Sequence, residues 1–173
     1  MRRLMFALAV SGLALASGAA TAGDVSYTPD DVVAFFLDSA NAGATRGICV
    51  GTAQECAQQA KPAGFDVMVN FDLASARLTP DAIENLKQVA TALADPRLAG
   101  ARFAIDGYTD ARGSEDYNQV LSTERAKAVA DFLVGQGVPP DRLVAIGNGE
   151  SSPRVPDPYD PVNRRVEMRI NLN

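Results

Sequence analysis

The chain has 173 residues, with 16 basic and 21 acidic side chains, no histidine, and a formal net charge of −5 at pH 7. This length suits one domain of ordinary size plus an extension. The acidic balance argues against nucleic acid and against anionic lipid as the main partner, because both attract basic surfaces.

The first 22 residues have the pattern of a secretory signal peptide. Arg2 and Arg3 precede an uncharged apolar run over 4–16, and the small residues Ala20-Thr21-Ala22 are typical of a cleavage site. The run is shorter than the roughly 20 residues that a membrane-spanning helix needs. We therefore expect export by general secretion and no transmembrane helix. Because Gly23 and not a cysteine would follow the cleavage site, no lipid anchor is expected there.

Residues 23–64 form an extension in which we predict one short helix, because an apolar run over 32–37 follows Thr28-Pro29-Asp30-Asp31. The two cysteines of the chain, Cys49 and Cys56, come just after it. A disulfide is the default for such a pair in an oxidising compartment, against a reactive pair or free thiols. Two thiols without any histidine are too few ligands for zinc, so no metal site is expected.

From residue 65 to residue 173 the pattern predicts one α+β domain. Alternating apolar residues indicate strands, and apolar residues at helical spacing indicate two helices, the first of which begins at Thr79-Pro80-Asp81. The order β-α-β-α-β-β favours a two-layer sandwich, with two helices covering one face of a mixed sheet. In chain order the predicted elements cover residues 66–72, 79–93, 102–108, 115–134, 143–146 and 165–172.

The second helix carries a charged residue within its apolar stripe. Arg125 lies four residues after Leu121 and four before Val129, on the side expected to face the sheet. A buried guanidinium without a partner costs several kcal/mol, so a carboxylate is expected to meet it. The leading candidate is Asp110, just past the second strand. The predicted stripe consists of Tyr117, Val120, Leu121, Ala128, Val129, Phe132 and Leu133.

A carboxylate, a guanidinium and the free N–H groups of a loop and a helix start would together favour a zwitterionic ligand. Its ammonium would bind Asp110, and its carboxylate would bind Arg125 through two parallel hydrogen bonds. From spacing alone, a purely structural ion pair explains Asp110 and Arg125 equally well.

Residues 66–172 resemble the OmpA-like peptidoglycan-associating domain through short motifs in a fixed order. The resemblance implies that Asp110 and Arg125 clasp the amino-acid end of diaminopimelate in the peptidoglycan stem peptide. It also implies that Thr109, Asn118 and Arg164 line the same pocket and that Asp72 stands near it. The motifs are Gly107-Tyr108-Thr109-Asp110, Gly113-Ser114, Tyr117-Asn118, Leu121-Ser122-x-x-Arg125-Ala126, Arg142-Leu143, Gly147-x-Gly149-Glu150, Pro153 and Asn163-Arg164-Arg165-Val166-Glu167.

These residues also have local interpretations, and the chain departs from the family pattern in places. Asn118 could cap a helix, Arg164 could be a solvated charge, and Asp72 could end a strand. Tyr108 stands where histidine is frequent, and Asn148 stands where an aromatic residue is common. The loop before Asn163 is short and contains Pro153, Pro156, Pro158 and Pro161, which would stiffen the rim of the pocket.

Other functions fit the sequence less well. A glycosidase would need paired carboxylates, but Asp106 is expected on the exposed face of its strand, and Glu115 and Asp116 suit a helix start. No histidine can serve as a base, and Gly147-Asn148-Gly149-Glu150 lacks the spacing of a phosphate loop. Flagellar stator proteins carry a similar domain but need a membrane helix.

We therefore expect a non-enzymatic, periplasmic peptidoglycan-binding protein without a cofactor. The main alternative is an envelope protein that binds other envelope proteins through the Phe35-Phe36 helix or the cysteine segment, and both roles can coexist.

Overall fold

The computed structural model describes residues 27–44 and 64–171, apart from 68, 70, 72 and 73. The predicted signal peptide, Cys49, Cys56 and Asp72 lie outside this part of the chain. Export, the disulfide and the place of Asp72 therefore stay predictions. Among the described helices, none has the length and apolar character needed to cross a membrane.

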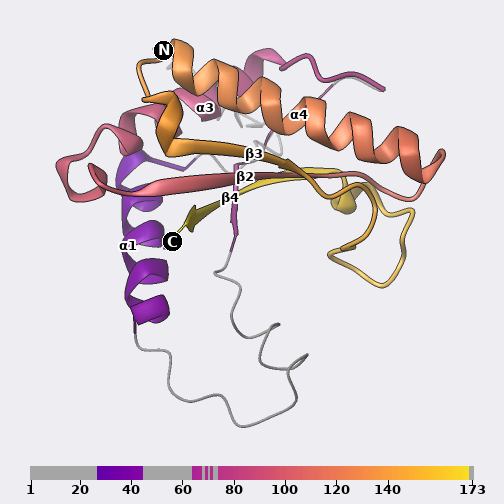
Figure 1. Cartoon of the computed structure of the whole chain (residues 1–173), viewed down its shortest axis with the longest axis horizontal. Helices are drawn as coiled ribbons and strands as arrows, with labels where there is room; N and C mark the ends of the chain where they lie inside the picture. Colours follow the sequence, from indigo (N-terminus) through magenta and orange to yellow (C-terminus); the bar gives the residue numbers. More distant parts are fainter. Residues whose placement is uncertain (1–26, 45–63, 68, 70, 72–73, 172–173) are drawn as a thin grey trace, which may run out of the picture.

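A four-stranded mixed sheet with the strand order β1-β4-β2-β3 forms the centre of the domain (Figure 1). Strand β4 (Arg165–Asn171) runs antiparallel to both β1 (Phe65–Asp66) and β2 (Arg102–Tyr108). Strand β3 (Leu143–Gly147) runs parallel to β2. The predicted α+β class and mixed sheet are confirmed. Because β2 lies between two neighbours, the loop that follows it starts from a firmly held strand.

The first strand is shorter than predicted. The ladder with β4 covers Phe65–Asp66, and the backbone N–H of Val67 extends it with a hydrogen bond of 3.2 Å to Val166. Val67 and Val69 are both buried, so the apolar alternation correctly identified which side chains face the core.

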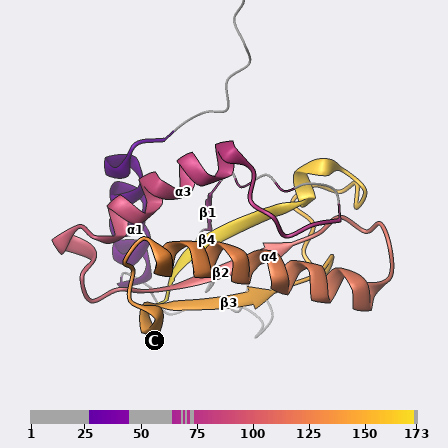
Figure 2. The same cartoon turned by 90° about the horizontal axis from the view of Figure 1, so that it is seen from above.

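Two helices, α3 (Pro80–Leu93) and α4 (Glu115–Gly135), cover one face of the sheet (Figures 1 and 2). Each begins after a capping hydroxyl, Thr79 or Ser114, whose oxygen accepts a hydrogen bond of 3.3 Å from the backbone N–H three residues on. Both predicted helix starts are therefore confirmed. Single-turn 3₁₀ helices occur at η1 (Pro96–Leu98), η2 (Pro140–Arg142) and η3 (Pro161–Asn163).

The extension contributes helix α1 (Pro29–Ala44), which packs against α3, β1 and β4. Its start is fixed reciprocally, because Thr28 N donates to the Asp31 carboxylate at 2.8 Å and Asp31 N donates to the Thr28 hydroxyl at 3.3 Å. The fully buried ring of Phe36 meets Phe103 of β2 edge-on, with the ring centroids 4.9 Å apart. This helix therefore shares the core of the domain.

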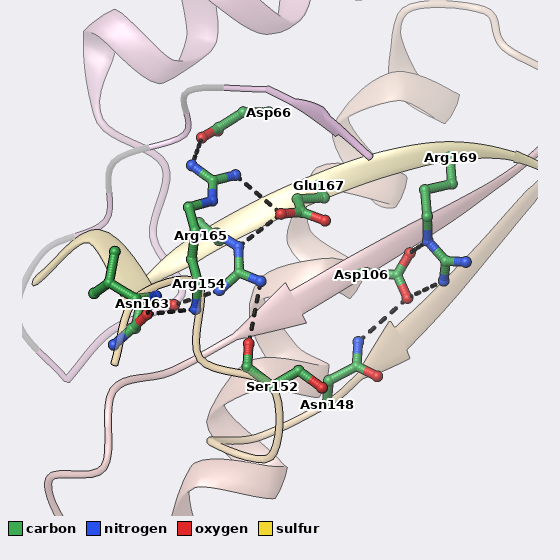
Figure 3. A network of polar contacts seen from close by, with 10 residues as sticks. Asp66, Asp106, Asn148, Ser152, Arg154, Asn163, Arg165, Glu167 and Arg169 are labelled. Atoms are coloured by element: carbon green, nitrogen blue, oxygen red, sulfur yellow. Dashed lines mark hydrogen bonds and ion pairs between the residues drawn. The ribbon is translucent and has the colours of Figure 1, made fainter. Parts of the chain in front are cut away.

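The sheet face opposite α3 and α4 carries an ionic network (Figure 3). Asp106 accepts hydrogen bonds of 2.8 and 2.6 Å from Arg169 of β4. Alternation placed Asp106 on this face, but the expectation that it is exposed is wrong: it is fully buried, because a guanidinium from the neighbouring strand lies against it. Beside this pair, Arg154 bridges Asp66 and Glu167 at 2.7 and 2.9 Å.

The buried side of α4 also differs from the predicted apolar stripe. Tyr117 and Val120 are about half exposed. The buried residues of the first turns include Asn118, Ser122 and Arg125, which are polar or charged. Their polar groups bond to loops, for example through the Ser122 hydroxyl, which accepts from Gly149 N at 2.9 Å. This half of the helix therefore faces polar loop backbone as well as the apolar core.

Candidate functional site

Two glycines allow α4 to approach the ends of β2 and β3 closely. A methyl group at Gly107 would collide with the backbone carbonyl oxygen of Ser122. A methyl group at Gly147 would collide with Thr123, the residue that follows Ser122 in α4. The loop after β2 is held in turn by a hydrogen bond of 2.9 Å from Thr109 N to Gly149 O. The loop carrying Asp110 and the helix carrying Arg125 are thus fixed relative to each other.

The Asp110 side chain lies at the base of the loop between β2 and α4, with 7% of its surface exposed. Its Oδ2 accepts hydrogen bonds from Arg112 at 2.6 Å and from Arg164 at 2.7 Å. Burial acts to raise the pKa of the carboxyl group, but the hydrogen bonds from Arg164 and Arg112 outweigh it and hold the pKa below its usual value. Asp110 is therefore an anion over the whole physiological pH range.

Arg125 is buried under the same loop, with 4% of its surface exposed. Its Nε donates to the Ser75 carbonyl oxygen at 3.1 Å, and its guanidinium lies 5.0 Å from the centre of the Phe71 ring. Burial and the nearby charge of Arg164 lower its pKa. Within the described part of the chain, Asp110 forms no ion pair with Arg125, so the expected direct pairing is wrong.

Among the described residues Arg125 has no carboxylate partner, and a backbone carbonyl oxygen and an aromatic face solvate it in part. Its terminal nitrogens donate to no group among the described residues. A guanidinium has five N–H donors, and those on the two terminal nitrogens of Arg125 have no partner among the described residues.

Asn118 and Thr109 lie beside this pair and are both buried. The Asn118 amide donates to the backbone oxygen of Asp110 at 3.2 Å and to the Glu150 carboxylate, and so ties the loop to the Gly147–Glu150 turn. The Thr109 hydroxyl is buried and has no hydrogen-bond partner within the described residues. Such a group is unusual in a protein interior and is consistent with a site that a ligand completes.

Arg164 reaches Asp110 from the position just before β4, at the end of the proline-rich loop. Asn163 organises this loop: its side-chain oxygen accepts from Arg154 N at 2.7 Å, and its amide donates to Asp157 O at 2.8 Å. A further hydrogen bond of 2.9 Å joins Ala111 N to Pro158 O. The loop that leads to Arg164 is therefore held in place beside the site.

These residues surround one cavity of about 470 Å³. Thr109, Asp110, Asn118, Arg125 and Arg164, all predicted as site residues, line it together. Arg125 and Arg164 also line a smaller adjoining hollow of about 190 Å³. In the described part of the chain, no three histidine, cysteine, aspartate or glutamate side chains gather to hold a metal ion.

Sequence reasoning missed several residues of the site. Arg112 and Tyr117 line the cavity, Glu150 binds Asn118, and the Ser75 carbonyl oxygen binds Arg125. The place of Arg112 two residues after Asp110 could have indicated a contact across a short loop. By contrast, nothing in the sequence marks the backbone oxygen of Ser75, because any residue carries a carbonyl group.

Comparisons with known proteins agree with this architecture. A model described as the OmpA family matches residues 70–167, more than half of the chain. Outer membrane protein A of Klebsiella aerogenes is 41% identical over 105 residues, which cover 60% of this chain and 29% of that protein. The chain thus spans less than a third of the length of this curated relative.

Two solved structures resemble the fold. The peptidoglycan-associated lipoprotein of Burkholderia pseudomallei aligns with a TM-score of 0.54 and 29% identity, over 60% of this chain and 88% of that one. A MotB-like protein of Desulfovibrio vulgaris aligns with a TM-score of 0.55 over 84% of this chain and 96% of that one. At 22% identity, the second likeness concerns the fold alone.

Proposed function

The chain belongs to the OmpA family, and on that basis we propose that it binds peptidoglycan non-covalently in the periplasm, with diaminopimelate of the stem peptide in the cavity. The name of the relative from Burkholderia pseudomallei, a peptidoglycan-associated lipoprotein, supports this ligand class. The protein would be exported by its predicted signal peptide. It would anchor to the wall whatever the extension binds, including other envelope proteins or a component of the outer membrane.

One observation carries the proposal: Asp110 and Arg125 line the same cavity without neutralising each other. A structural ion pair would bring the two charges into contact. Here the carboxylate and the guanidinium line one cavity without contacting each other. A ligand with an ammonium and a carboxylate can therefore bind both. Thr109 and Asn118 would add polar contacts at its side, and Arg164 would attract a further negative group.

The site favours binding over catalysis. A carboxyl group that donates protons to a substrate has a raised pKa, whereas that of Asp110 is lowered by its arginine neighbours. The lowered pKa suits a permanent anion that holds a cation. The proposed role therefore involves no covalent bond made or broken.

The decisive experiment is co-sedimentation of the purified protein with diaminopimelate-containing peptidoglycan. Asp110→Ala and Arg125→Ala should stay in solution while the wild type pellets. Arg125→Lys should bind about tenfold or more weakly, because a point charge cannot replace two parallel hydrogen bonds to a carboxylate. Arg102→Ala is the matched control, since Arg102 is exposed and lies at the opposite end of β2.

Circular dichroism and thermal unfolding would verify that each variant is folded. If the wild type stays in solution, or if folded Asp110→Ala and Arg125→Ala proteins pellet as well as the wild type, the cavity is not the wall-binding site. The two residues would then be structural, and a protein partner of the extension would become the leading function.

A further inference from the structure

The Asp110 carboxylate is already occupied by cations of the protein itself. Its Oδ2 accepts from Arg112 at 2.6 Å and from Arg164 at 2.7 Å, and its Oδ1 accepts from the backbone N–H of Arg112 at 3.2 Å. With 7% of the side chain exposed, little surface remains for another donor. A ligand ammonium that binds Asp110 must therefore take the place of one of these groups.

We propose that the Arg112 guanidinium competes internally for Asp110, and that it must swing away before a ligand ammonium can bind there. This inference rests on the proposed function, because it concerns the regulation of the same cavity. Arg112 thereby sets the affinity of the site, and it admits only ligands whose cation binds Asp110 well enough to displace an arginine.

The surroundings of the two arginines indicate which one moves. The Arg112 side chain is 59% exposed, against 39% for Arg164. The backbone before Arg164 is fixed by the buried Asn163 side chain, which is bonded to three groups of the proline-rich loop. Arg164 N also donates to Pro161 O at 3.0 Å. Arg164 is therefore the anchored cation of the pair.

Arg112 has a fixed backbone and a largely exposed side chain. Its neighbour Ala111 is bonded to Pro158, so the loop keeps its shape when the side chain moves. The guanidinium already lies 6.0 Å from the centre of the exposed Tyr159 ring, which offers a second resting place. Release of Arg112 thus needs only a rotation of the side chain.

The expected effect on affinity is modest. Ion pairs at exposed groups contribute little, so competition by Arg112 lowers ligand affinity by up to about fivefold. The expected gain for a variant without this arginine is therefore about two- to fivefold. The proposal predicts an increase where a simple contact residue would give a decrease.

The test is isothermal titration calorimetry of the whole purified protein with a soluble stem peptide that ends in diaminopimelate. Arg112→Gln should bind the peptide about two- to fivefold more tightly than the wild type. Arg102→Gln, which removes the same charge from an exposed position at the far end of β2, should bind like the wild type. An NMR titration should show a higher pKa for Asp110 in Arg112→Gln, since one of its donors is lost.

The outcomes separate this inference from the function on which it rests. If the wild type binds and Arg112→Gln binds equally well or more weakly, Arg112 does not compete and the inference is wrong. An equal gain in Arg102→Gln would mean a general charge effect and would also overturn it. No binding by the wild type or by Arg112→Gln would overturn the proposed function itself.

Discussion

At the scale of single residues, the domain keeps charged groups buried by giving each of them a polar, charged or aromatic partner. Arg125 is held by a carbonyl oxygen and an aromatic ring, Asp110 by two guanidinium groups, and Asp106 by Arg169. Burial without such partners would cost several kcal/mol for each ion. Among the described residues the terminal nitrogens of Arg125 have no hydrogen-bond partner, so in the proposed function they bind the ligand carboxylate.

The lowered pKa of Asp110 predicts how its contribution to stability depends on pH. The ionised form is favoured in the folded state, so its contribution is fully present above the unfolded value of about 3.9. It is lost as the pH falls through the lower folded-state pKa. Asp110→Asn should therefore unfold at a lower temperature than the wild type at pH 7, and the difference should shrink below about pH 4.

Thermal unfolding followed by circular dichroism across this pH range would check the prediction. Asp131→Asn is a suitable control. Asp131 forms an ion pair with Lys127 on the exposed surface of α4, and such a pair contributes little to the stability of the fold. If the difference in unfolding temperature between Asp110→Asn and the wild type stays constant with pH, the charge of Asp110 does not stabilise the fold.

The residues of the site were largely predictable, but their mutual contacts were not. The motif order placed Asp110, Asn118 and Arg125 together, because a loop and the helix after it return to the same strand end. Which cation meets Asp110 depends on side-chain rotamers and on the proline-rich loop, which local spacing does not encode. The predicted pairing with Arg125 failed because Arg112 and Arg164 reach the carboxylate instead.

At the scale of elements, the close contact between α4 and the strand ends positions the site. The contact depends on Gly107, where a Cβ would overlap the carbonyl oxygen of Ser122. Gly107→Ala should therefore push the helix outward, destabilise the domain by about 1–3 kcal/mol and weaken peptidoglycan binding.

The control for this prediction is Gly135→Ala at the end of the same helix, where a Cβ meets nothing within 4 Å. It should leave stability unchanged or raise it slightly, because alanine favours helix. Urea denaturation and co-sedimentation would measure both effects. Equal stability of the two variants would contradict the role given to the close contact.

The sequence predicted helices better than it predicted helix faces. Thr79 and Ser114 mark their helix starts because capping is a local interaction. The stripe of α4 was assigned from apolar spacing, and Tyr117 and Val120 were misplaced because the first turns of α4 face polar loops. Loops made of distant segments are tertiary features, which periodicity along one helix cannot reveal.

At the scale of the whole molecule, α1 is bound into the same core as the family domain. Phe36 is fully buried and contacts rings from two strands, Phe65 of β1 and Phe103 of β2. Phe36→Ala should lower the free energy of unfolding by about 3–5 kcal/mol in a single transition. Phe35 is only partly buried, so Phe35→Ala should lower the free energy of unfolding by less.

Calorimetry would test whether the extension and the domain unfold together. A separate transition for the extension, or an unchanged main transition in Phe36→Ala, would mean that α1 is only loosely attached. The sequence indicated a helix here but not its place, because nothing local states which surface an apolar helix covers.

The position of the cavity at the end of β2 also determines how the domain would respond to a pulling force. In both views α1 lies at the opposite end of the sheet from the loop between β2 and α4 (Figures 1 and 2). Under the proposed function, a tensile load between the cell wall and the extension would run along the length of the sheet, in which β2 is a central strand. Its ladders with β3 and β4 would bear the load side by side in shear, so many bonds would have to rupture at once. Under the same proposal, the few ionic contacts between the cavity and its ligand would break before these ladders, so the domain would detach from the wall before it unfolded.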